Sequence, residues 1–178
     1  MGERTGAVDV HYPETGGARA ALVVAADDRF ATLVDERITW LEHVAPYRPG
    51  AFFERELPAV EAVLAGVDLK LLIVDGYVDL DPDGRPGLGA HVHAKLGVPV
   101  IGVAKTAFAA AAHAVPVRRG GSDRPLYVTA AGVPVADAAA LVAAMSGPYR
   151  MPDALRRVDA LARGHVTPSR PIGPVISA

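Results

Sequence analysis

The feature that most constrains the fold is a run at residues 69–74, apolar apart from Lys70, that ends in Asp75 and Gly76. A strand that is apolar on both faces is typical of the buried centre of a parallel sheet. Asp75 then places a carboxylate at the end of a buried strand, where a charge is costly unless a metal, a base or water meets it. Gly76 lets the chain turn away without a side chain blocking the approach. An ordinary Asp-Gly turn is the alternative, because such turns are common.

The segments before this run predict an antiparallel meander. Alternating apolar and polar residues indicate a strand at 8–12, and two further strands are expected at 18–26 and 30–40, with a hairpin loop between these two at 26–29. From residue 52 to 64 the apolar spacing becomes helical.

Helices and strands alternate in the rest of the chain. Helices are predicted at 88–96, 136–145 and 153–163, and strands at 98–104 and 126–129. The alanine-rich segment 107–114 is ambiguous. Three antiparallel strands followed by alternating helices and parallel strands predict an α/β fold, a ribonuclease H-like mixed sheet flanked by helices.

Length and composition indicate one domain without disulfides. A chain of 178 residues that is 51% hydrophobic can bury a substantial core, so residues 1–178 are expected to form a single domain, with 165–178 as a flexible tail. There is no cysteine, which excludes thiolate metal sites. The sequence has neither a signal-peptide pattern nor an apolar run approaching the ~20 residues of a membrane span, so we expect a cytoplasmic monomer without a membrane partner.

Charge is distributed unevenly along the chain. Residues 1–117 carry 16 acidic and 10 basic side chains, whereas residues 118–170 carry 4 acidic and 8 basic ones. An acidic part beside a basic part fits a metal site next to a phosphate-binding surface. The same imbalance also fits chance.

Three carboxylates are candidates for one metal site. Asp9 lies in the middle of the first predicted strand, and Glu56 lies near the start of the helix at 52–64. If the first strand pairs beside the strand of Asp75, the two aspartates converge at one end of the sheet. Three oxygen ligands suit Mg²⁺ or Mn²⁺. Such an ion can activate water and stabilise the oxyanions of a phosphodiester.

Six short blocks in a fixed order span nearly the whole chain. They are Asp9-Val10-His11-Tyr12; Pro46-Tyr47-Arg48-Pro49-Gly50 with Arg55-Glu56-Leu57-Pro58; Val74-Asp75-Gly76; Pro99-Val100-Ile101-Gly102-Val103-Ala104-Lys105; Pro125-Leu126-Tyr127-Val128-Thr129; and Gly147-Pro148-Tyr149-Arg150-Met151-Pro152-Asp153. In this order they resemble the endonuclease V family. Members of that family are nucleases that use Mg²⁺ to cut a strand near a deaminated base, typically inosine or deoxyinosine.

The resemblance implies roles for individual residues. Asp9, Glu56 and Asp75 take the catalytic, metal-binding positions, and Lys105 could hold a phosphate as a point charge. Tyr47 falls where the family places a wedge whose ring stacks on bases. A solvated lysine and a tyrosine packed on its own loop are the alternatives. Contacts to the nucleic acid or to the base are expected from Tyr47, Pro49, Gly50, Gly76, Gly102 and Ala104.

The chain departs from the family pattern at three positions where histidines are expected. Tyr77 follows Gly76 where the family has a histidine, and Asp81 takes the place of the histidine in a histidine-proline pair. After the late strand, Gly132 is followed by Val133 instead of a histidine. Asp81 is therefore predicted to bind the metal directly or through water.

These features predict a Mg²⁺-dependent endonuclease, with Mn²⁺ as an alternative ion, that acts in nucleic-acid repair. DNA is the expected partner, and RNA is the open alternative. The rival hypothesis is a nucleic-acid-binding homologue that is non-catalytic, or altered in specificity, because part of the site has been lost.

Overall fold

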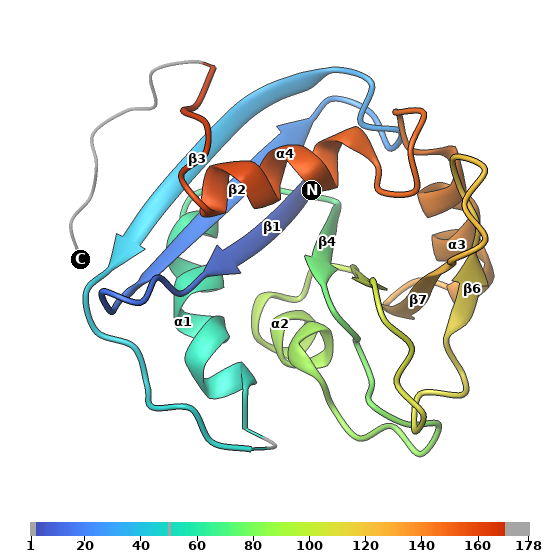
Figure 1. The fold of residues 1–178 in the computed structure, drawn as a ribbon, viewed down its shortest axis with the longest axis horizontal. Helices are drawn as coiled ribbons and strands as arrows, with labels where there is room; N and C mark the ends of the chain where they lie inside the picture. The colour runs from blue at the N-terminus through green and yellow to red at the C-terminus, as the bar shows by residue number, and fades with distance from the viewer. Residues whose placement is uncertain (1–2, 50, 170–178) are drawn as a thin grey trace.

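The computed structural model of the chain describes residues 3–49 and 51–169, which form a mixed sheet with helices on both faces (Figure 1). The strands are β1 (Thr5–His11), β2 (Ala18–Ala25), β3 (Leu33–Leu41), β4 (Leu71–Asp75), β5 (Val100–Ala104), β6 (Val115–Val117) and β7 (Leu126–Ala131). The helices are α1 (Phe53–Leu64), α2 (Leu88–Leu96), α3 (Val135–Ala144) and α4 (Asp153–Ala162). Along the sheet the strands are ordered β3-β2-β1-β4-β5-β7-β6.

The strand directions confirm the predicted α/β sheet and correct its last part. The meander β1-β2-β3 is antiparallel, and β1, β4 and β5 are mutually parallel neighbours, as predicted. The last strands are not parallel, however: β7 runs antiparallel to β5, and β6, which was not predicted, pairs antiparallel with β7. The segment between β5 and β7 contains no helix that could carry the chain back across the sheet. A parallel connection usually needs such a crossover.

The central strands are apolar on both faces because helices cover both. In β4, Leu71 and Ile73 pack with α3 and α4, whereas Leu72 and Val74 pack with α1 and α2. In Figure 1, α4 crosses in front of β1 and β2. The apolar run before Asp75 therefore lies in the middle of the sheet, as expected. Within the described residues, no helix has the length and apolarity needed to cross a membrane.

A buried hydrogen bond fixes the chain just after β4. Gly76 has a φ of +102°, in the left-handed region, and the chain then runs across β5 and β7. There the backbone N–H of Val78 donates to Thr129 Oγ1 at 2.8 Å. A Cβ at Gly102 would lie 2.6 Å from the carbonyl oxygen of Gly76, so this glycine leaves room for the crossing chain.

Residues near the C-terminus lie against β3. The buried carboxylate of Glu36 accepts two hydrogen bonds from Arg157, at 2.7 and 2.9 Å, and one from the backbone N–H of Ser169. The bonds from Arg157 are the largest cause of the lowered pKa of Glu36. Of the segment 165–178, for which flexibility was predicted, residues 170–178 lie outside the described residues, and that expectation stays a prediction.

We predict that Thr129→Val destabilises the protein more than Thr129→Ser. Valine removes the hydroxyl acceptor and leaves the buried N–H of Val78 unsatisfied, at a cost of about 1–3 kcal/mol. For a chain of this size the melting temperature should fall by about 3–10 °C. Serine keeps the acceptor and serves as the matched control. Equal melting curves for wild type and Thr129→Val would contradict this role.

Candidate active site

Three of the predicted residues lie where the parallel pairing of β1, β4 and β5 ends. Val8 of β1 pairs with Val74 of β4, so the next residues, Asp9 and Asp75, lie beside each other. Lys105 follows β5, and its Nζ lies 3.3 Å from Asp75 Oδ2. Because side chains alternate along a strand, all three lie on the face that α4 covers. The convergence predicted from sequence is therefore present.

Glu56 approaches the same point from α1, on the other side of the sheet. It shares a helix face with Val60 and Val63, four and seven residues later, which are buried against the strands. Packing of these apolar residues draws Glu56 in with them, so it is only 9% exposed. The helix thereby holds a carboxylate at the strand ends.

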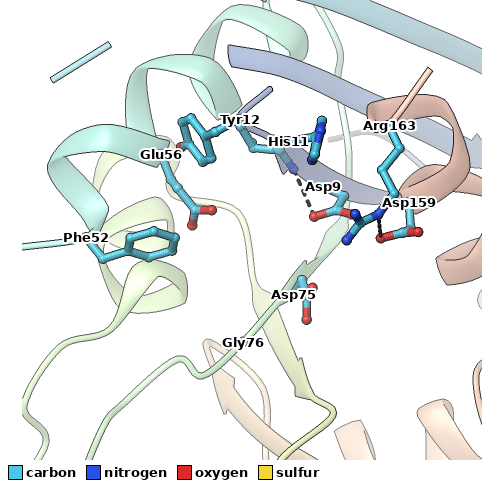
Figure 2. Close-up of a pocket in the computed structure, with 10 residues that line it drawn as sticks. Asp9, His11, Tyr12, Phe52, Glu56, Asp75, Gly76, Asp159 and Arg163 are labelled. Carbon is cyan, nitrogen blue, oxygen red and sulfur yellow. Dashed lines mark hydrogen bonds and ion pairs between the residues drawn. The ribbon is translucent and has the colours of Figure 1, made fainter. Parts of the chain in front are cut away.

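The acidic side chains surround one cavity of about 350 Å³, here called the acidic cavity (Figure 2). Figure 2 shows the carboxylates of Asp9, Glu56 and Asp75 around this space, with Asp159 and Arg163 of the α4 end beside Asp9. The cavity is lined by Asp9, Val10, His11, Tyr12, Phe52, Glu56, Asp75, Gly76, Asp159 and Arg163. Asp159 and Arg163 were not predicted as site residues.

Burial and repulsion between neighbouring carboxylates raise the pKa of two of these acids. Desolvation raises the pKa of Asp9 to about 7, and the charges of Asp75 and Asp159 add to the shift. Desolvation also raises the pKa of Glu56 to about 8, with Asp9 and Asp75 contributing. Shifted titratable groups gathered in a cavity are typical of functional sites.

The donor chemistry of the cavity fits a hard divalent cation. Its acids supply carboxylate oxygens, which Mg²⁺ and Mn²⁺ prefer. Burial and neighbouring negative charges raise the pKa of Asp9 and of Glu56, and a bound cation would offset both effects. No three acidic, histidine or cysteine side chains in residues 3–49 and 51–169 stand in a ready ligand arrangement, however. Asp75 contacts Lys105, and Asp9 Oδ1 accepts a hydrogen bond from the backbone N–H of Val10.

A second cavity, of about 450 Å³, adjoins the first and is mainly aromatic and apolar. We call it the aromatic cavity. Tyr77 helps to form its wall: its hydroxyl donates to the carbonyl oxygen of Thr106 at 2.8 Å and accepts from the N–H of Phe108 at 3.0 Å. The cavity is lined by Phe52, Phe53, Glu56, Asp75, Gly76, Tyr77, Leu80, Arg85, Pro86, Gly87, Leu88 and Phe108.

The predicted wedge lies near both cavities. The side chain of Tyr47 is 63% exposed, and its ring meets the ring of Phe52 edge-on, with centroids 6.5 Å apart. Phe52 lines the acidic and the aromatic cavity. Pro49 is exposed next to this loop, and Gly50 lies outside the described residues.

The other predicted contact residues are placed differently. Gly76 lines both cavities. Gly102 and Ala104 are buried within β5, beneath the chain that follows Gly76, and line neither cavity. Their packing supports the walls from behind.

Asp81 is not brought into the acidic cavity. Its Oδ1 accepts hydrogen bonds from the backbone N–H groups of Asp83 and Arg85, at 3.1 and 3.0 Å. Its Oδ2 lies 3.5 Å from Arg85 Nε. The carboxylate therefore stabilises its own loop, beside the aromatic cavity that Arg85 lines.

Comparisons with known proteins agree on one family. The sequence profile described as Endonuclease V matches residues 2–133. The Endonuclease V of Streptomyces coelicolor is 33% identical over 183 residues, which cover 90% of this chain and 78% of that protein. The crystal structure of the Endonuclease V of Streptomyces avermitilis has a TM-score of 0.75 and 31% identity, over 91% of this chain and 80% of that one.

A more distant structure has the same fold. The Endonuclease V of Ciona intestinalis, in complex with a 24mer DNA containing an inosine followed by a ribo-adenosine, has a TM-score of 0.72 and 17% identity. It covers 92% of this chain and 85% of that chain. The ribonuclease H-like fold predicted from sequence is thereby confirmed.

We predict that the metal-free protein loses stability as the pH rises from about 4 to about 8. Asp9 and Glu56 ordinarily titrate at 3.8 and 4.5, but in the folded protein they keep their protons up to about 7 and 8. The unfolded chain therefore releases protons first, and folding becomes less favourable across that window. Glu56→Gln removes one ionisation and should raise the melting temperature in EDTA at pH 8 by at least about 3 °C.

Glu54→Gln is the matched control, because Glu54 is exposed on the same helix. It should follow the wild-type pH dependence. Identical pH profiles for wild type and both variants would show that burial of Glu56 imposes no such penalty.

Proposed function

This chain belongs to the endonuclease V family of nucleases, and we propose that it is a metal-dependent endonuclease that hydrolyses a phosphodiester bond near a deaminated base. The observation that carries the proposal is the acidic cavity, in which carboxylates from β1, α1 and β4 meet at one end of the sheet. Such a gathering of acids, with Glu56 buried and Asp9 part-buried, has no structural necessity, because it destabilises the fold unless a cation is bound.

Asp9, Glu56 and Asp75 are the residues that would hold the divalent ion, with Mg²⁺ as the first candidate and Mn²⁺ as the second. When bound, such an ion lowers the pKa of a water molecule and offsets charge on phosphate oxygens. The protein contributes a partly closed cavity in which the acids are desolvated, so their attraction for a cation is stronger than in open water.

Lys105 is proposed to hold an oxygen of the scissile phosphate. It lies at the end of β5, directly beside Asp75, and its side chain is 41% exposed. Its ammonium group can therefore meet a phosphate that approaches from solvent. Asp75 keeps this cation close to the strand ends through the 3.3 Å contact.

The aromatic cavity is proposed to receive the recognised base, inosine or deoxyinosine. It shares Glu56, Asp75 and Gly76 with the acidic cavity, so a base held there lies next to the place of cutting. Rings of Phe52, Phe53, Tyr77 and Phe108 offer stacking surfaces for a flipped base. The inosine-containing DNA bound by a protein of the same fold supports DNA as partner.

An altered base preference is the second candidate. Tyr77 stands where the family has a histidine, and its hydroxyl holds the loop of Thr106 and Phe108 across the aromatic cavity. A cavity shaped by this loop could favour another base or RNA. A purely binding function is disfavoured, because binding alone gives no reason to bury Asp9 and Glu56 together.

We predict that Asp75→Asn abolishes cutting while the protein stays folded. The substitution keeps the shape of the side chain and removes a ligand charge, so metal-dependent cleavage should fall by at least about a thousandfold. The assay uses labelled strands with and without deoxyinosine or inosine, in Mg²⁺, Mn²⁺ and EDTA. Asp83→Asn, in an exposed loop position, is the control for loss of one negative charge.

Wild type should cut only with metal and preferentially near the deaminated base. Cutting by Asp75→Asn at the wild-type rate would refute the assigned site. If all strands are cut at the same rate, the nuclease activity is supported, but the preference for a deaminated base is excluded.

We also predict that Tyr47→Ala loses selectivity more than chemistry. An exposed ring that stacks on a base contributes about 1–3 kcal/mol, so binding of the modified strand should weaken by about 5- to 150-fold. Residual metal-dependent cutting of unmodified strands should persist. Tyr47→Phe keeps the ring and should behave like wild type. Unchanged binding and preference in Tyr47→Ala would identify this tyrosine as loop packing.

A further inference from the structure

Arg163 brings a positive charge into the acidic cavity from the end of α4. It directly follows the last helical residue, Ala162, and lines the cavity together with Asp9, Asp75 and Asp159. Its side chain is 47% exposed, so it is open to a ligand that enters from solvent. The family roles considered above assign nothing to this residue.

A single ion pair fixes the direction of this guanidinium. Arg163 Nε donates to Asp159 Oδ1 at 3.0 Å, one helical turn earlier on the same face of α4. Figure 2 shows the group beside Asp9, at the edge of the cavity. The ion pair with Asp159 therefore orients the guanidinium toward Asp9.

Within the described part of the chain, the rest of the guanidinium has no protein partner. In residues 3–49 and 51–169, the bond to Asp159 is the one hydrogen bond made by the Arg163 side chain, so both Nη groups remain available. Arg157, on the same helix, differs: its Nε and Nη2 are both bound by the carboxylate of Glu36. Arg157 thus uses Nε and Nη2 to hold the fold, whereas Arg163 uses Nε alone and keeps both Nη groups for a ligand.

The surrounding negative charges stabilise the guanidinium of Arg163, which is positively charged in any case. The hydrogen bond to Asp159 is the largest cause of its raised pKa, and the charges of Asp159, Asp9 and Asp75 add to it. Lys105 contacts Asp75 on the side of β5. Two positive groups thus stand beside the acids, Lys105 at Asp75 and Arg163 beside Asp9 and Asp159.

We propose that Arg163 is a phosphate-binding residue of this site, which donates through its Nη groups to a nonbridging oxygen of the nucleic-acid strand at or next to the scissile bond, opposite Lys105. This inference rests on the proposed nuclease function. Arg163 neither gives nor takes a proton in this role. Guanidinium groups suit it because they offer paired donors to phosphate oxygens.

The competing explanation is that Arg163 is an internal counter-ion that only neutralises the acids. The two roles differ in what removal does. A counter-ion competes with the bound metal, so its loss should lower the metal concentration needed for half-maximal activity. If Arg163 instead binds a phosphate of the nucleic-acid strand, its loss should weaken the contact with that one phosphate.

The test combines Arg163→Gln with strands that each carry one neutral methylphosphonate near the deaminated base. Binding is measured in EDTA by fluorescence anisotropy, so the readout does not depend on turnover. For wild type, neutralising the contacted phosphate should weaken binding by about 10- to 100-fold. In Arg163→Gln that penalty should vanish at one position while penalties elsewhere persist. Arg163→Lys should recover part of it.

Arg156→Gln is the matched control, because Arg156 lies on the same helix, pairs with Asp153 and does not line the acidic cavity. It should keep the wild-type penalty at every position. With metal present, Arg163→Gln should lower kcat/KM by about 10- to 100-fold without reducing the metal requirement. Melting curves of all variants report whether they are folded.

Unchanged penalties in Arg163→Gln, or a lower metal requirement with full activity, would overturn the phosphate-binding role and leave a counter-ion. If wild type neither binds nor cuts any inosine-containing strand, the proposed function fails and this inference falls with it. If wild type binds and cuts inosine-containing strands and Arg163→Gln behaves in the same way, the phosphate-binding role is wrong but the proposed function stands.

Discussion

The parallel pairing of β1 with β4 is the constraint on which the rest of the site depends. Its register matches Val8 with Val74, so Asp9 and Asp75 lie side by side where the pairing of the two strands ends. A shift by one residue would turn one of the two carboxylates to the opposite face. Burial on both sides of the sheet helps to fix this register, because a slip would move a charged residue from one end of β4 into a buried layer.

The other groups reach the same point from different directions. Glu56 comes from α1 on one face, Asp159 and Arg163 come from the end of α4 on the other, and Lys105 comes from the neighbouring β5. Desolvation raises the pKa of Asp9 and of Glu56, and the crowded negative charges raise both values further. Such crowding lowers the stability of the empty fold, which is the usual relation between a functional site and its scaffold.

Sequence alone predicted the part of the site that lies on strands. The apolar runs before Asp75 and Lys105 mark strands that are buried on both faces, and Asp9 lies in an alternating strand. Glu56 was proposed from its place near the start of the helix at 52–64, and the resemblance to the endonuclease V family supported that proposal. The direction of β7 was missed because alternation does not reveal strand direction, although the lack of a helix between β5 and β7 was a usable signal. The edge strand β6 is short and contains a proline, which weakens its pattern.

The α4 residues were missed for a different reason. Asp159 and Arg163 are spaced four apart, which in a sequence is typical of an exposed ion pair on a helix. Only the packing of α4 across the sheet brings that pair to the strand ends. Asp81 shows the opposite error: its place in the family pattern favoured a metal role, but local backbone N–H groups and Arg85 hold its carboxylate in the loop.

The central claim is that acids from β1, α1 and β4 form one cation site. The most direct measurement is Mn²⁺ binding, followed by the electron paramagnetic resonance signal of the free ion, for wild type, Asp9→Asn, Glu56→Gln and Asp75→Asn. The account predicts saturable binding by wild type and a loss of at least about tenfold in affinity in each variant, because each removes one ligand charge. Equal binding by wild type and all three variants, with every protein folded, would contradict it.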